Sequence, residues 1–324
     1  MRSVGIDIGS SSIKVVEILA TNKRLSVVKF FEHPLGLNPA FDPEIEILDF
    51  LKSLTHSYDA NSTKIVLGLK QDFISARFKT FPFQDRLKIL KSLPFELEED
   101  LPFSTENAIF DAKICRYTGN QAEVLALASP RHRITGSLQR AKDSGLDVHI
   151  LSSEAVALAN CIEDWADAPP AVPALPILSE SSDLDSSPKK PIQILIHIGH
   201  TRTLVLAFSE NKLVGVRSLY WGAKNVIDGI VRKYEIPFIE ASKEFQTKAF
   251  ILLNKDQASY DQIVFSDIIS NQIKEFSKEL RIAILEFQAE FNADFQGIQI
   301  SGGGAQIQNL NAFLTTQLDL PVNR

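Results

Sequence analysis

The sequence predicts an α/β protein of two lobes that share one architecture, and three observations support this fold class. The chain has 324 residues, which is too long for one ordinary hydrophobic core and fits about two domains. Residues 5–18 (GIDIGSSSIKVVEI) and residues 195–208 (LIHIGHTRTLVLAF) repeat one pattern. Between these blocks, residues 165–191 concentrate Pro, Ser and Asp without a sustained period, which predicts a flexible linker or an irregular ordered loop.

Each repeated block consists of a short apolar strand, a glycine turn with Ser or Thr, and a second strand that alternates apolar and polar residues. A third candidate strand follows in both halves, at 25–31 and at 213–220. Two such meanders predict a duplicated fold with one sheet per lobe, while chance similarity between short hairpins is the alternative. When the second block is aligned with the first by one fixed shift along the chain, identical residues match. The matching pairs are Ile6 with Ile196, Ile8 with Ile198, Gly9 with Gly199, and Val15 with Val205.

Helical and strand periodicities predict the remaining elements. We expect the helix over 84–100 to break near Pro94, and the helix over 130–144 to end at Gly145. The other candidate helices are 44–56, 153–161, 224–233, 240–250, 266–289 and 309–318. The candidate strands are 64–69, 73–81, 107–116, 121–128 and 297–301.

Composition excludes several classes of protein. Apolar residues make up 44% and charged residues 23% of the chain, which is the range of globular proteins. The net charge of −6 and the absence of a basic stripe argue against a nucleic-acid partner. Cys115 and Cys161 have no companion at ligand spacing, so neither a disulfide framework nor a zinc site is expected. Because the sequence has no signal core and no window of about 20 apolar residues, we expect a cytoplasmic protein.

The turn after the first strand is rich in groups that bind anions. Backbone N–H and hydroxyl groups in such a turn can point at a phosphate, although an ordinary hairpin uses the same residue types. Asp7, at the end of the strand, can orient the water shell of a magnesium ion. The residues expected around the phosphate are Gly9, Ser10, Ser11, Ser12 and Lys14.

The mid-chain block repeats this turn with one change of chemistry. His197 stands where the first block has Asp7, and a histidine cannot hold a magnesium-bound water as a carboxylate does. A structural histidine is the alternative to a functional one. The residues expected at the second phosphate face are Gly199, Thr201 and Thr203.

A third turn, Ser-Gly-Gly-Gly-Ala at 301–305, lies between a predicted strand and a predicted helix. Glycines there let the backbone approach a flat or anionic group, and a purely structural turn is the alternative. The spacing is not that of a dinucleotide-binding G-x-G-x-x-G, and the chain contains no P-loop sequence. The residues expected to approach such a group are Gly302, Gly303 and Gly304.

Aromatic and acidic residues alternate in the segment 95–103. The acidic run 96–100 is interpreted as a solvated helix end, with a metal or partner site as the alternative. The interleaved residues Phe95, Leu97, Leu101 and Phe103 predict core packing or a groove for a partner peptide.

The order of the three turns resembles the superfamily of actin and hexokinase, in which they are the two phosphate motifs and the adenosine motif. More closely, the chain resembles the PilM/GspL group within that superfamily. The resemblance covers nearly the whole chain apart from the linker, and the segment 81–103 is its most diagnostic part. It rests on GIDIGSSSIKVVEI (5–18), FPFQDRLKILKSLPFELEEDLPF (81–103), SEAVALAN (153–160) and ISGGGAQIQNL (300–310).

The resemblance implies a duplicated actin-like ATPase (ribonuclease-H-like) fold, with two lobes around a central nucleotide cleft and an FtsA-like inserted subdomain. The expected first lobe is 1–163, with the inserted subdomain at about 60–150. A linker at 164–191 and a second lobe at 192–324 follow, the latter with a small subdomain at about 222–296.

It also implies a cytoplasmic platform protein of a type IV pilus or type II secretion machine, at the inner face of the bacterial inner membrane. PilM-like members bind a short cytoplasmic tail of a bitopic membrane partner, whereas GspL-like members carry their own membrane helix and recruit the secretion ATPase. The segment 81–103 favours a GspL-type chain, and the final LDLPV resembles a strand cut short, so we expect a piece of a longer protein. A homodimer is compatible with this fold.

The expected cofactors are ATP or ADP and Mg²⁺. With His197 in the second turn, the carboxylate arrangement for hydrolysis is half missing, so we expect hydrolysis to be very slow or absent and assign no catalytic residue. Two alternatives stay open. One is an interaction module without nucleotide, and the other is a sugar-kinase-like phosphotransferase, for which no motif places a carboxylate base.

Overall fold

The computed structural model describes residues 1–324 except 22–23, 37–41, 59–61 and 164–190. The chain divides into two compact units, Met1–Asn160 and Cys161–Arg324. The predicted linker lies, apart from its last residue, outside the described residues.

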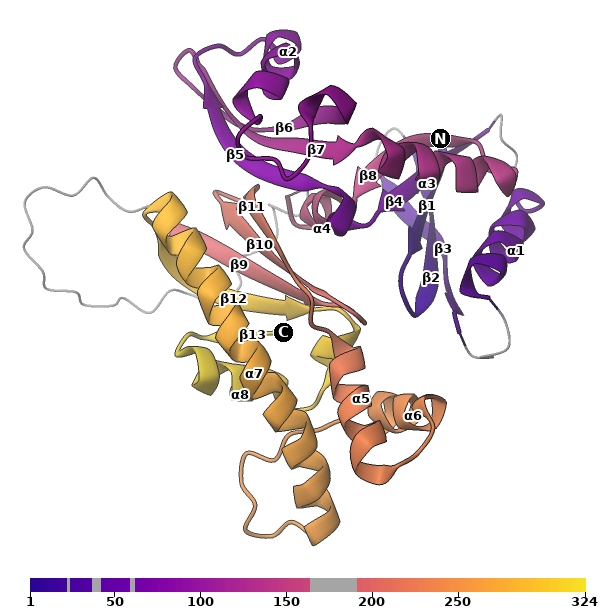
Figure 1. Cartoon of the computed structure of the whole chain (residues 1–324), viewed down its shortest axis with the longest axis vertical. Coiled ribbons are helices and arrows are strands. Elements are labelled where there is room, and N and C mark those ends of the chain that lie inside the picture. Colours follow the sequence, from indigo (N-terminus) through magenta and orange to yellow (C-terminus); the bar gives the residue numbers. More distant parts are fainter. Residues whose placement is uncertain (22–23, 37–41, 59–61, 164–190) are drawn as a thin grey trace, which may run out of the picture. The chain divides into compact units, whose positions relative to one another are not determined.

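The sheet of the first unit has five strands in the order β3-β2-β1-β4-β8 (Figure 1). The first three form an antiparallel meander, and β4 and β8 then run parallel to β1. Alternate residues of the strands face α1 (Pro43–Thr55) and α3 (Arg131–Asp143) and form one apolar core. The strands are β1 (Arg2–Ile8), β2 (Ser12–Ala20), β3 (Leu25–Pro34), β4 (Thr63–Leu69) and β8 (Val148–Ser153).

A second, three-stranded antiparallel sheet in the first unit has the order β5-β7-β6. Its strands are β5 (Ser75–Phe81), β6 (Ala108–Thr118) and β7 (Gln121–Pro130). The helix α2 (Arg86–Glu96) covers one face, where Ile89 and Leu93 are fully buried. Short 3₁₀ turns occur at Gln71–Phe73 and Thr105–Asn107.

The predicted break near Pro94 is wrong, because α2 continues through Pro94 and ends at Glu96. A proline so close to the end of a helix removes little hydrogen bonding, and the chain turns immediately afterwards. Of the two expectations for the interleaved residues, core packing holds for Leu97, Leu101 and Phe103. The side chain of Phe95 is exposed.

The second unit repeats the topology of the first, with the strand order β11-β10-β9-β12-β13 (Figure 1). Again an antiparallel meander is followed by parallel strands, so the duplication predicted from the two sequence blocks is confirmed. The strands are β9 (Pro191–Ile198), β10 (Thr203–Ser209), β11 (Lys212–Leu219), β12 (Asp294–Ser301) and β13 (Val322–Asn323).

The helices of the second unit pack through one long apolar stripe. On α7 (Tyr260–Phe291), Phe276 stacks on Trp221 with ring centroids 4.0 Å apart. The stripe is buried along its length and consists of Ile269, Ile273, Phe276, Leu280, Ile284 and Phe287. Ser259 caps the start of α7 through Gln262, which explains why it begins before the predicted 266. The other helices of this unit are α5 (Ala223–Tyr234), α6 (Phe238–Lys248), the 3₁₀ turn η3 (Gly303–Gln306) and α8 (Leu310–Leu318), while α4 (Glu154–Glu163) begins in the first unit and ends just past its boundary. Within the described ranges, no helix is both long and apolar enough to span a bilayer.

Candidate functional site

The two predicted phosphate turns have the same backbone geometry. In the first, the amide of Gly9 donates to the carbonyl of Ser12 at 3.0 Å, and in the second Gly199 donates to Arg202 at 2.9 Å. A Cβ added to Gly9 would lie 2.8 Å from that carbonyl oxygen, and one added to Gly199 would lie 2.9 Å from its counterpart. Both turns therefore require glycine at the same position, for the same steric reason.

Three predicted residues of the first turn lie together. Asp7 pairs across the sheet with Lys14, so both side chains share one face of the meander. The Nζ atom of Lys14 donates to the hydroxyl of Ser12 at 3.0 Å and lies 3.7 Å from a carboxylate oxygen of Glu32. Gly68 of β4 lies beside Asp7 of β1. Because Gly68 has no side chain, space remains next to the carboxylate of Asp7. This cluster presents one cation, the carboxylates of Asp7 and Glu32, and the hydroxyl of Ser12 at the end of the sheet.

Among the described residues, no group of three or more His, Cys, Asp or Glu side chains is arranged to hold a metal ion. A single carboxylate such as Asp7 fits a magnesium ion that keeps most of its water shell, rather than an ion bound directly by the protein.

In the second turn, two side chains have structural partners. The ring of His197 lies 3.0 Å from the hydroxyl of Ser301, a hydrogen bond between the ends of β9 and β12. Thr203 is fully buried, and its hydroxyl donates to the carbonyl of Trp221 at 2.9 Å. The Thr203 hydroxyl therefore points into the core, which differs from the expected contact with phosphate, whereas the side chain of Thr201 is exposed.

The three glycines of the last turn have different surroundings. Gly302 has φ +90, and a side chain there would collide with the backbone of Ile198. Gly304 packs directly on the side chain of Ile198, while a Cβ on Gly303 would meet no atom within 4 Å. The glycine turn thus lies against the residue that precedes Gly199, so two of the three predicted motifs are in contact within the second unit.

The second turn also holds the start of α5. The amides of Ala223 and Lys224 donate to the carbonyls of Gly199 and His200 at 3.0 and 2.8 Å, and these bonds satisfy two of the amides that a helix start leaves unpaired. Gly222 is needed for this close approach. Sequence reasoning missed this contact, although the capping pattern at 222–225 is a signal for it.

A further missed neighbour of the glycine turn is the segment after α6. Phe250 forms a parallel bridge with Gln308, and the amide of Ile251 donates to the carbonyl of Gln308 at 3.0 Å. The side chain of Asn309 donates to Ile251 at 2.8 Å. The segment that follows α6 is therefore fixed beside the turn expected to receive adenosine. No local sequence pattern predicts these contacts.

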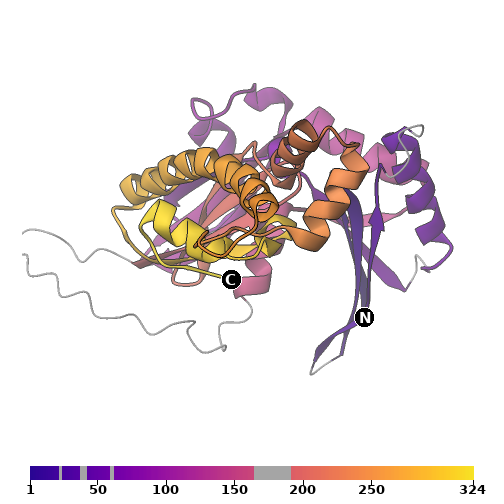
Figure 2. The same cartoon turned by 90° about the horizontal axis from the view of Figure 1, so that it is seen from below.

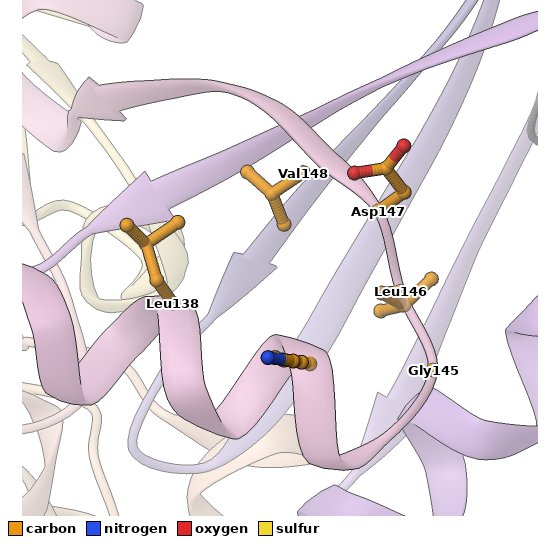
Figure 3. Close-up of a pocket in the computed structure, with 6 residues that line it drawn as sticks. Leu138, Gly145, Leu146, Asp147 and Val148 are labelled. Atoms are coloured by element: carbon orange, nitrogen blue, oxygen red, sulfur yellow. The ribbon is translucent and has the colours of Figure 1, made fainter.

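The first unit has a surface depression of about 430 Å³ between α3 and β8 (Figure 3). Leu138, Leu146 and Val148 supply apolar surface, and Lys142 and Asp147 supply one charge of each sign. Val148 is the first residue of β8, an outer strand of its sheet, so the depression lies at the start of that strand.

Comparison with solved structures defines the class of protein. The chain is similar to a structure described as a PilM–PilN type IV pilus biogenesis complex, with a TM-score of 0.75, 18% identity and coverage of 99% of this chain and 87% of that chain. It is also similar to MreB5 of Spiroplasma citri bound to ADP, with a TM-score of 0.54, 12% identity and coverage of 99% and 90%. It is similar as well to the ethanolamine utilization protein EutJ from Carboxydothermus hydrogenoformans, with a TM-score of 0.52, 11% identity and coverage of 100% of this chain and 84% of that chain. The predicted actin-like ATPase fold is confirmed.

The family profile described as "Type IV pilus assembly protein PilM" matches residues 5–323, and the chain belongs to this family. The expected leaning towards a GspL-type chain is not confirmed, because the matching family is PilM.

Proposed function

We propose that the protein is a cytoplasmic platform component of a type IV pilus machine at the inner face of the bacterial inner membrane, where it binds the short cytoplasmic tail of a bitopic membrane protein. Membership of the PilM family over residues 5–323 is the observation that carries this proposal. Similarity to a PilM–PilN complex supports the kind of partner. The pilus or secretion ATPase is a further proposed partner, and a homodimer remains part of the proposal.

The depression between α3 and β8 is the proposed place for the tail. Apolar walls with one cation and one carboxylate suit a short peptide that carries aliphatic side chains and a polar backbone. The outer edge of β8 offers backbone donors and acceptors to an extended segment.

Fluorescence polarisation with a labelled synthetic peptide, made from the cytoplasmic tail of a PilN protein, tests the proposal. Leu138→Asp should weaken peptide binding by at least about tenfold, because a carboxylate would enter an apolar wall. The matched control is Ile282→Asp, a similarly exposed aliphatic residue on α7, which should bind as the parent does. No binding to the parent chain would overturn the proposal.

We further propose that the chain binds ATP or ADP together with hydrated Mg²⁺. The support is the pair of equivalent glycine turns and the fold shared with MreB5, a protein solved with ADP. Asp7 would orient the hydrated magnesium ion, and Thr203 would keep the second turn in shape. The proposed phosphate contacts are Gly9, Ser10, Ser11, Ser12, Lys14, Gly199 and Thr201, and the proposed adenosine contacts are Gly302, Gly303 and Gly304.

The domain boundaries are part of the same proposal. The proposed lobes are 1–163 and 192–324. The sheet β5-β7-β6, over 75–130, supports an inserted subdomain within the proposed 60–150, whereas β4 and α3 of that range belong to the main sheet and its core. The run of helices from α5 to α7 supports a small subdomain at about 222–296.

A module without nucleotide is a second candidate, favoured by the second turn. There the ring of His197 and the hydroxyl of Thr203 already have protein partners. Titration calorimetry with ADP and Mg²⁺ separates the two candidates, because absence of both binding heat and thermal stabilisation would select the module without nucleotide.

A further inference from the structure

The end of the β2–β3 hairpin exposes apolar side chains. We call residues 18–21 together with residues 24–31 the hairpin end. Leu25, Val27 and Phe30 are 75%, 66% and 63% exposed, although apolar residues of this size are usually covered in a sheet. Val28 and Leu19 are exposed as well. In Figure 2 the strands β2 and β3 extend beyond the start of β1.

The exposed apolar residues lie on both faces of the hairpin end. Paired residues of neighbouring strands share a face, and Leu25, Val27 and Phe30 pair with Ala20, Ile18 and Val16. These partners alternate with Val15 and Glu17, which belong to the buried face of the sheet. Leu19 points to that second face, beyond the core. A partner that covered only one face would leave apolar surface in water.

The hairpin end is also positively charged in an otherwise acidic chain. Its described residues include Arg24 and Lys29 and no Asp or Glu, whereas the whole chain has a net charge of −6. The nearest carboxylate along β2, that of Glu17, is buried and bound to Arg2 at 2.9 Å. Two carboxylates flank the hairpin end, and both are paired with cations outside it: Glu17, opposite Lys29, is bound to Arg2, and Glu32 lies 3.7 Å from Lys14.

We propose that the hairpin end binds the surface of an anionic lipid bilayer, with its apolar side chains in the interface and its cations at the headgroups. Immersion covers both faces of the hairpin at once, and anionic headgroups match Arg24 and Lys29. This contact goes beyond tail and nucleotide binding and does not depend on either.

Edge pairing with a second copy of the chain explains the surface less well. β3 is an outer strand, but its register with β2 shifts between Glu17 and Ile18, and such a bulge disturbs regular pairing. Moreover, pairing at the edge leaves side chains on both faces in water. The bilayer accounts for the side chains and the charge together.

Co-sedimentation of the full chain with vesicles of phosphatidylglycerol and phosphatidylethanolamine tests this proposal. We expect binding to these vesicles, weaker binding in high salt, and little binding to phosphatidylcholine alone. Absence of binding to anionic vesicles would overturn the proposal, as would equal binding to neutral ones.

Phe30→Asp should weaken vesicle binding by at least about tenfold, and Arg24→Gln by about fivefold. The matched control is Leu253→Asp, because Leu253 is 60% exposed and lies in the other unit. Thermal unfolding should be nearly unchanged in all three variants, since the replaced side chains are exposed. Phe30→Asp chains that bind vesicles like the parent would contradict the inference. The inference would also be contradicted if the parent chain bound no vesicles but formed, in light scattering, a dimer that Phe30→Asp abolishes.

Discussion

His197 and Ser301 join the ends of two parallel strands, with the histidine Nδ1 atom 3.0 Å from the serine hydroxyl. The equivalent position in the first unit, Asp7, carries a carboxylate and pairs with Lys14. The duplicated fold is therefore chemically asymmetric at this position. One half offers an anion that can orient magnesium-bound water, and the other half offers an imidazole that ties the sheet to the glycine turn.

From this asymmetry we expect slow or absent nucleotide hydrolysis. Phosphate release by the purified chain with ATP and Mg²⁺ should remain far below about one turnover per second, the lower end of ordinary enzyme rates. A second carboxylate that could position the attacking water is missing from the paired turn. A measured rate near one per second would contradict this expectation.

Substitutions of the two threonines of the second turn should have different effects, one on the stability of the fold and the other on nucleotide binding. Thr203→Val keeps the shape of the side chain but leaves the buried carbonyl of Trp221 without its donor, so the free energy of unfolding should fall by about 1–3 kcal/mol. Thr201→Val changes an exposed residue, so we expect nearly unchanged stability and weaker ADP binding. Chemical denaturation and calorimetry on both variants give the comparison. Equal stability of the two variants would be inconsistent with the assigned roles.

The last turn provides a second contrast, between neighbouring glycines. Gly302→Ala would place a methyl group against the backbone of Ile198 at a φ of +90, so we expect a loss of about 2 kcal/mol or more in the free energy of unfolding. Gly303→Ala meets no atom within 4 Å and should fold normally, with weakened nucleotide binding if adenosine contacts this position. Thermal melts of both variants check the first part, and calorimetry with ADP checks the second.

The sequence was sufficient for the duplicated topology, because Gly9 and Gly199 lie in matched strand–turn–strand blocks whose geometry is dictated locally. The strand β8 was missed, since its sequence VHILSS is short and half exposed and shows no clear alternation. The inward direction of Thr203 was also missed, because its acceptor is the carbonyl of Trp221, 18 residues away in the chain. Contacts between Phe250 and Gln308 are likewise set by packing, not by local pattern.

A lysine substitution tests the first turn directly. Lys14→Met removes the cation beside Ser12 while keeping the length of the side chain, so ADP binding should weaken by roughly tenfold. Lys52→Met, at an exposed position of α1 in the same unit, is the matched control and should bind ADP normally. If Lys14→Met binds ADP as the parent does, the first turn does not contact phosphate through this residue.

The last prediction concerns alkaline stability and Tyr58. Burial, and next the negative charge of Glu17, raise the pKa of the Tyr58 phenol above its ordinary value of 10.0, although Arg2 partly opposes this. Because the folded state keeps the neutral phenol longer than the unfolded state does, the stabilisation is complete below about pH 10 and is lost as pH rises through the folded pKa. Tyr58→Phe should therefore lose stability less steeply than the parent between about pH 9.5 and 11 in urea unfolding. The exposed Tyr260→Phe serves as the control and should follow the parent. Identical pH profiles for Tyr58→Phe and the parent would show that the ionisation of this phenol is not coupled to folding.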